Sequence, residues 1–395
     1  MNLDFAPSPS SEHPGLLIRD PFHYTDAMLL IPPVLVECLD CFDGLQSALD
    51  LRLRLVQITG ELDLGGIDGE LVETLSGAGF LEDDVFREMR ERRTGEFAAC
   101  PVREPAVAGS AYPADPAEAR EFLARCVDGA APPADPGLFA IAAPHVSPEA
   151  GWRSYGAAYG RLRPEHKDRT FVILATSHYG EPDNLGLTRK PFRTPLGEAQ
   201  PDIARIDWLA AHGGAGVTVE DYCQSFEHTV ELQVIFLQHL LGPEVKILPV
   251  LVGPFAHSIY EGGMPEDNDR VRAFFDALGE LREREGDSLF WVLGVDMAHM
   301  GPRYHDSLEV KAGEGFMREV EERDRNRIAR INALDAGGFW DLVQSGHDDL
   351  KWCGASPFYA FLKTAPKASG ELLSYEQWNI DERSVVTFAG MAFRK

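Results

Sequence analysis

Short apolar runs alternate with helical patterns from Pro101 to the end of the chain. The four clearest runs cover residues 139–143, 170–175, 245–252 and 288–295, and they contain almost no charged residues. Runs of this length without polar alternation are typical of strands buried on both faces. Because helical stretches separate them, they predict an α/β sheet covered on both sides by helices. Ligands of such sheets bind beyond the carboxyl ends of the strands, so we expect functional side chains there.

The first 100 residues follow another pattern, in which short helices are separated by a turn or small hairpin. An apolar run at 28–31 stops at a pair of prolines, and helical spacing at 34–39 stops at Asp43-Gly44. A second helix is expected over 67–80, and a charged one over 83–93. We therefore predict a small, mostly helical domain in residues 1–100, followed by an α/β domain in residues 101–395.

Composition excludes several classes of function. The formal net charge is −26, from 63 acidic and 37 basic residues, which disfavours nucleic acid as a partner. No stretch approaches the roughly 20 apolar residues that a membrane span requires. The first residues, MNLDFAPSPSSEHPG, lack the basic and apolar regions of a signal peptide. We expect a cytoplasmic protein without a membrane partner.

The six cysteines are too few and too scattered for a disulfide scaffold, so we interpret them as reduced thiols. Cys38 and Cys41 form a Cys-x-x-Cys pair, but no second pair or histidine motif completes a zinc site. One helical turn would separate them, and Cys38 is more simply a core residue.

Residues that bind metals or exchange protons follow the predicted strands. A histidine follows each of the first two runs, an Asp-x-x-His follows the fourth, a cysteine lies in a loop before a predicted helix, and a Glu-His-x-x-Glu opens another helix: His145, His178 with Tyr179, Asp296 with His299, Cys353, and Glu227-His228 with Glu231. Each has an ordinary explanation as a cap, a buried thiol or a solvated helix face. Three strand ends that all carry such groups are harder to explain by chance.

Imidazole and thiolate suit iron, copper and zinc, and carboxylates behind them fix the imidazole tautomer. Ligands far apart in sequence can converge when they leave the same edge of one sheet. A set that lacks a fourth protein donor would leave room for water, O₂ or a substrate.

These residues also resemble a known family. From Pro101 onward the chain is similar to the MEMO family, whose bacterial members are often called AmmeMemoRadiSam system protein B. The matching motifs occur in family order: Ala-Gly-Ser-Ala-Tyr-Pro at 108–113, Ala-Pro-His at 143–145, Ser-His at 177–178, Arg-Thr-Pro-Leu-Gly at 193–197, Glu-His-Thr-Val-Glu at 227–231, Leu-Pro-Val-Leu-Val-Gly at 248–253, Asp-Met-Ala-His at 296–299 and Cys-Gly at 353–354.

This resemblance implies a fold similar to the class III extradiol dioxygenases, which use non-haem iron. It implies iron(II) or copper, with zinc less expected, as a single redox-active ion. The implied ligands are His145, His178 and Cys353. Asp296 and His299 would be acid–base groups in the same pocket, and His228, Glu231 and Tyr179 would shape it.

Two further features bear on the resemblance. The family usually continues Ala-Pro-His with Ala-Gly-Tyr, whereas here Val146-Ser147-Pro148-Glu149 looks like an insertion beside a ligand. It could reshape the pocket mouth, and Glu149 could add a carboxylate. The N-terminal region loosely resembles the PqqD-like winged-helix domains, some of which hold a peptide.

The first hypothesis is therefore a redox-active iron or copper enzyme of dioxygenase-like type, acting on a small molecule or a peptide. Its rival is a metal-dependent peptide-binding or adaptor protein without turnover. A zinc hydrolase ranks last, because the His-Glu-x-x-His helix of common zinc peptidases is missing. The sequence leaves the question of catalysis open.

Overall fold

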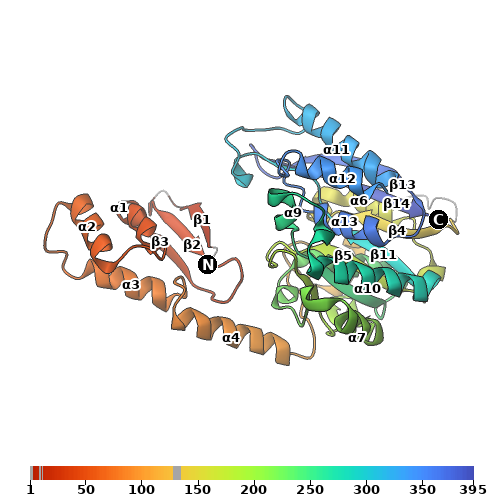
Figure 1. The fold of residues 1–395 in the computed structure, drawn as a ribbon, viewed down its shortest axis with the longest axis horizontal. Helices are drawn as coiled ribbons and strands as arrows, with labels where there is room; N and C mark the ends of the chain where they lie inside the picture. The colour runs from red at the N-terminus through yellow and green to blue at the C-terminus, as the bar shows by residue number, and fades with distance from the viewer. Residues whose placement is uncertain (1–2, 9, 11, 128–134) are drawn as a thin grey trace. The chain divides into compact units, whose positions relative to one another are not determined.

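The computed structural model describes residues 3–8, 10, 12–127 and 135–395 (Figure 1). The chain forms two compact units, Met1–Cys100 and Pro101–Lys395, which we call unit 1 and unit 2. None of the helices in the described ranges has both the length and the apolar composition needed to cross a membrane.

Unit 1 begins with a three-stranded antiparallel sheet and continues with helices. Its elements are β1 (Asp4–Pro7), β2 (Leu16–Arg19), β3 (Met28–Ile31), α1 (Pro33–Val36), η1 (Glu37–Phe42), α2 (Ala48–Thr59), α3 (Ile67–Gly77) and α4 (Asp84–Ala99). The sequence pattern predicted only a turn or small hairpin here. It missed the three-stranded sheet because strands of four residues are too short to show a clear alternation. Side chains including Ile18, Leu55 and Leu75 form the core of this unit.

Unit 2 is built on one large mixed sheet with helices on both faces (Figure 1). Its strand order is β12-β14-β4-β11-β5-β10-β6-β9, with β13 paired to β14 and β8 paired to β10 and β7. The strands are β4 (Leu138–Ala143), β5 (Thr170–Thr176), β6 (Leu185–Leu187), β7 (Phe192–Thr194), β8 (Gly197–Pro201), β9 (Val217–Val219), β10 (Lys246–Val252), β11 (Leu289–Gly294), β12 (His299–Met300), β13 (Ser369–Asn379) and β14 (Val385–Arg394).

Side chains of the central strands point alternately to the two faces of the sheet and form two hydrophobic cores, one on each face. On one face they pack against α5 (Pro116–Val127), α6 (Pro148–Tyr159) and α8 (His228–Leu241). On the other face they pack against α7 (Ile203–His212), α10 (Asp269–Glu285), α11 (Met317–Asn332), α12 (Ala336–Gln344) and α13 (Ala355–Thr364). The remaining helices are α9 (Ala256–Glu261), η2 (Pro164–His166), η3 (Gly214–Gly216), η4 (Tyr222–Ser225), η5 (Pro265–Asp267), η6 (Gly286–Ser288) and η7 (Pro302–Tyr304). The predicted α/β sheet covered on both sides is confirmed.

The register of the parallel strands determines where the site forms. β4, β11, β5 and β10 are neighbours and run parallel, and each corresponds to one of the four apolar runs. Gly294 at the end of β11 is aligned with Ala143 of β4 and with Ala175 of β5. The segments that follow these three strands therefore emerge side by side at one edge of the sheet.

Candidate metal centre

His145 lies two residues beyond the end of β4 and points into unit 2, with 3% of its surface exposed. Its Nδ1 is 3.0 Å from the carbonyl oxygen of Gly294, at the end of the neighbouring strand. That carbonyl fixes the tautomer by accepting a hydrogen bond from Nδ1–H, which leaves the lone pair of Nε2 free to bind a metal. The backbone N–H of His145 donates to Oδ1 of Asp296 at 2.9 Å, which joins the ends of β4 and β11.

His178 and His228 are both oriented by the carboxylate of Glu227. The Nδ1 atom of His178 is 3.2 Å from Oε1 of Glu227, and the Nδ1 atom of His228 is 3.1 Å from the same oxygen. Glu227 also accepts the backbone N–H of His178 at 2.8 Å and caps α8 by accepting those of His228 and Thr229. One buried carboxylate thus joins the end of β5 to the start of α8.

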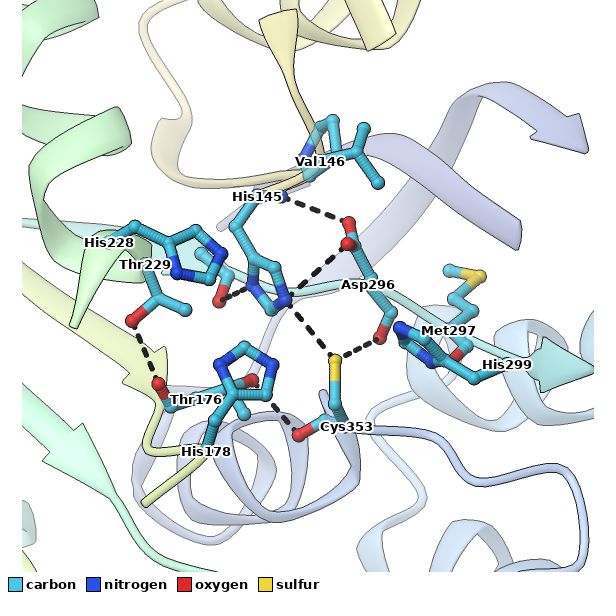
Figure 2. Close-up of polar contacts among 12 residues, drawn as sticks. His145, Val146, Thr176, His178, His228, Thr229, Asp296, Met297, His299 and Cys353 are labelled. Carbon is cyan, nitrogen blue, oxygen red and sulfur yellow. Dashed lines mark hydrogen bonds and ion pairs between the residues drawn. The ribbon is translucent and has the colours of Figure 1, made fainter. Parts of the chain in front are cut away.

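The three imidazoles converge at the sheet edge (Figure 2). One nitrogen from each of His145, His178 and His228 lies within 4.8 Å of the others, a spacing that could hold a metal ion. The rings of His178 and His228 stack with centroids 5.3 Å apart, and both stand nearly perpendicular to the ring of His145. These histidines leave two strand ends and one helix start, so rigid elements hold all three.

Cys353 and Asp296 flank this group on the side of His145 (Figure 2). The Sγ atom of Cys353 is 3.3 Å from Nε2 of His145, and Oδ2 of Asp296 is 3.4 Å from the same nitrogen. Ligand bonds of about 2.0–2.3 Å in tetrahedral geometry separate neighbouring donors by about 3.4–3.6 Å. The donor set and its spacing therefore fit a transition metal.

Two hydrogen bonds hold the loop that carries Cys353, one from the end of β5 and one to the segment that follows β11. Thr176, the last residue of β5, donates its hydroxyl to the carbonyl of Cys353 at 2.9 Å. The backbone N–H of Gly354 donates to the carbonyl of Asp296 at 3.1 Å. A Cβ on Gly354 would lie 2.6 Å from that carbonyl oxygen, so the approach of the two loops requires glycine.

Charges in the centre are strongly coupled. Burial would raise the pKa of Glu227, but His178 and His228 outweigh it and hold that pKa well below its usual value. For His178 the signs are reversed: burial alone would lower its pKa, but Glu227 and Cys353 outweigh burial and raise the pKa well above its usual value. Burial and the neighbouring histidines lower the pKa of His145, whereas burial raises the pKa of the Cys353 thiol. Glu227 therefore supplies a fixed negative charge that would offset a bound cation.

Asp296 and His299 line the same cleft, as expected, but they are held by different partners. The ring of His299 is held by two backbone carbonyls, since its Nδ1 lies 2.9 Å from Met297 O and 3.0 Å from Lys351 O. Asp296 faces His145 instead. Burial raises the pKa of Asp296 to about 6 and lowers the pKa of His299 to about 4.

A cleft of about 580 Å³ opens onto the centre and is lined by the three histidines, Asp296 and His299. Tyr179 also lines it, as do Val146 and Ser147 of the segment that looked like an insertion. Glu149, which could have added a carboxylate, lies in the first turn of α6 with its side chain exposed, and it is not among the described residues that line the cleft. The cleft has the size of a small-molecule site.

Glu231, which we expected to shape the pocket, is not among the described residues that line the cleft. It is fully buried and pairs with Arg103, while its carboxylate also accepts the hydroxyl of Tyr112 and the backbone N–H of Ala106. Arg103 donates to the carbonyl oxygen of Glu227 at 2.7 Å. Glu231 therefore acts on the site indirectly, by holding the start of α8.

Sequence reasoning missed the role of Glu227 and treated His228 as a neighbour of the ligands. A signal was present, because glutamate is an unusual residue at a helix N-cap, where Ser, Thr, Asp and Asn are preferred. A glutamate in that place, followed by histidine, indicates that the carboxylate has other partners.

Taken together, the fold and the site define an α/β protein with a histidine-rich, metal-capable centre at the carboxyl edge of its sheet. The family model of Memo-like proteins matches residues 103–392, and the chain belongs to this family.

Named relatives support this assignment. A MEMO1 family protein of Aquifex aeolicus is 25% identical over 381 residues, which cover 95% of each chain. One of Methanopyrus kandleri is 28% identical and covers 74% of this chain but 99% of its own length. One of Thermococcus kodakarensis is 29% identical, with 74% of this chain and all of its own length covered.

Proposed function

We propose that unit 2 is a redox-active metalloenzyme that binds one iron(II) or copper ion and acts on a small molecule in the cleft, in a dioxygenase-like manner. The observation that carries this proposal is the convergence of three histidine nitrogens within 4.8 Å, with the Cys353 thiol beside His145. Imidazole and thiolate donors together favour iron, copper or zinc over magnesium or calcium. When bound, such a metal supplies an open coordination position and a change of oxidation state.

The side chains around the donors have separate tasks. Glu227 keeps the rings of His178 and His228 in one orientation, and the carbonyl of Gly294 does the same for His145. Because its ring donates from Nδ1 to backbone carbonyls, His299 has Nε2 left to accept a proton. With a pKa of about 4 it is neutral at pH 7, whereas the pKa of about 6 lets Asp296 hold or release a proton near neutrality.

The experiment is a metal analysis of protein purified without a metal-chelating tag, with His145→Ala, His178→Ala and His228→Ala beside it. We expect near-stoichiometric iron or copper that these variants lose, followed by O₂ consumption with candidate substrates. His257→Ala is the matched control, because His257 is exposed on α9 and pairs with Glu261. If no metal is retained, and none is taken up anaerobically as Fe(II) or Cu(I), the metalloenzyme proposal fails.

The rival function is a metal-dependent peptide-binding or adaptor protein, and one feature of unit 1 favours a peptide there. A cavity of about 520 Å³ is lined by apolar side chains that include Phe5, Ile18 and Leu75, with Asp43 among its polar residues. Phe5 is 54% exposed, so an apolar side chain is available at this cavity. The first 100 residues carry 19 acidic and 7 basic residues, which favours a basic, apolar peptide.

An array of short peptides of varied charge tests this second proposal. We expect the full chain to select basic, apolar sequences and Phe5→Asp to lose them, while Val85→Asp, a change at another exposed apolar residue of unit 1, keeps them. Equal binding by Phe5→Asp would contradict the proposal. Peptide binding without turnover would favour the adaptor over the enzyme.

A further inference from the structure

One part of the cleft wall is apolar and separate from the two main cores. Val146, Val386 and Phe388 form a small buried cluster, against which Tyr304, Trp378 and Ile380 pack. All of these except Phe388 line the cleft that opens onto the metal centre. The cleft therefore offers aromatic and branched aliphatic surface beside the metal-capable histidines, which suits the body of an apolar ligand.

The cleft also holds one permanent positive charge. Among the described residues that line it, Arg303 is the only arginine or lysine. Its backbone N–H donates to the hydroxyl of Ser384 at 3.1 Å, which fixes the short helix η7 that carries it. No carboxylate in the described part of the chain comes within the ion-pair distance of its guanidinium, although Asp381 is close enough to feel its charge.

This charge stands out against a protein with a formal net charge of −26. Asp296, the one acidic residue among the described residues that line the cleft, forms no ion pair with Arg303; it is buried and accepts the backbone N–H of His145. A guanidinium without a partner is matched to a planar carboxylate, which it binds through two parallel hydrogen bonds.

We propose that the cleft binds a small apolar or aromatic carboxylic acid. Its carboxylate pairs with Arg303, and its apolar body packs on Trp378, Ile380 and Val386. Its far end then lies toward His145 and His178, where chemistry at the metal centre would act on it. That last step rests on the proposed function, whereas the recognition of the acid by Arg303 does not.

The test compares 3-phenylpropionate with its uncharged amide, because the two probes differ in charge but hardly in shape. Binding is measured by calorimetry on the full chain, both metal-loaded and treated with chelator. We expect the acid to bind at least about fivefold more tightly than the amide in both states, which is about 1 kcal/mol. Arg303→Gln should abolish this preference, and Ile380→Asp should weaken both probes.

Arg383→Gln is the matched control, since Arg383 is exposed, pairs with Glu309 and does not line the cleft. Its preference for the acid should equal that of the unchanged protein. If the preference survives Arg303→Gln but disappears on metal removal, the carboxylate binds the metal and the assignment of Arg303 is wrong. Equal affinity for acid and amide, or no binding of either, also overturns the proposal. Metal content of the same samples is recorded separately, so a centre that binds no metal is distinguishable from a cleft that does not select acids.

Discussion

Individual side chains in the centre carry protons that a metal would have to displace. Burial raises the pKa of the Cys353 thiol, so it is protonated near neutral pH in the absence of metal. A metal binds the thiolate, and binding therefore releases that proton. Cys353 lies 3.3 Å from Nε2 of His145, close enough to be a ligand as the family resemblance implies.

The first prediction follows from this proton. Apparent metal affinity should rise with pH below the pKa of the thiol, by about tenfold per pH unit for each proton released. In Cys353→Ala the slope of log affinity against pH should fall by about one. Competition with a chromophoric chelator between about pH 6 and pH 8 measures it. His228→Ala provides the contrast: if it loses more affinity than Cys353→Ala and the slope of the latter is unchanged, the ligands are the three histidines alone.

Glu227 is the residue on which the second prediction rests. Glu227→Gln keeps the shape but removes the charge that orients two imidazoles, and its amide cannot accept every N–H that the carboxylate accepts. We expect metal affinity to fall by about 10–100-fold, the range seen when a partner of a ligating histidine is removed. Glu266→Gln, which alters a carboxylate bonded to Tyr359 and Lys363, should leave affinity unchanged. Unchanged affinity in Glu227→Gln would mean that the rings are held by packing alone.

At the scale of elements, a buried carboxylate on α11 holds two loops of the centre together. Asp324 is fully buried and accepts hydrogen bonds from Trp352 Nε1 at 2.7 Å and from the hydroxyl of Thr387 at 2.7 Å. Trp352 precedes Cys353 in the chain. Thr387 in turn accepts the backbone N–H of Ala298 at 2.8 Å, within the loop of Asp296 and His299.

The third prediction is that Asp324→Asn disturbs the centre as well as stability. The amide can accept from fewer donors, so one buried donor loses its partner, at a cost of about 1–3 kcal/mol. We also expect a shifted thiolate-to-metal absorption band in the Co(II)-loaded protein, because the loop of Cys353 moves. Asp202→Asn is the control, since it breaks a similar network with Thr170 and Arg205. Loss of stability with the spectrum unchanged in both variants would limit Asp324 to a structural role.

Elements also explain what could be predicted from the sequence. The four parallel strands stood out because they are buried on both faces and read as continuous apolar runs. Parallel register then brought His145, His178 and Asp296 together, as expected for strand ends on one edge. Glu227 was a candidate, but its role could not be predicted because its partner His178 follows a strand far away in the sequence. The short strands of unit 1 were missed because four residues show no clear period. Contacts that form only through tertiary packing cannot be predicted from the local sequence pattern.

At the scale of the whole molecule, the relatives differ in how much of this chain they match, and the difference is about the size of unit 1. Those of Methanopyrus kandleri and Thermococcus kodakarensis are matched over nearly their whole lengths by 74% of this chain. The relative of Aquifex aeolicus is matched over 95% of this chain, which must include most of unit 1. The family model begins at residue 103, immediately after unit 1. The family therefore includes proteins about as long as unit 2 and others as long as both units.

The fourth prediction is that residues 101–395, produced alone, fold and bind metal with the affinity of the full chain. The donors, Glu227 and the Asp324 network all lie in unit 2, and so does the pair of Arg103 and Glu231 that holds the start of α8. Chelator competition and urea unfolding of both proteins measure this, with metal-loaded full chain as the reference. A peptide selected by the full chain should no longer bind the shortened one, because its cavity lies in unit 1. A lower metal affinity of the shortened protein would contradict this prediction.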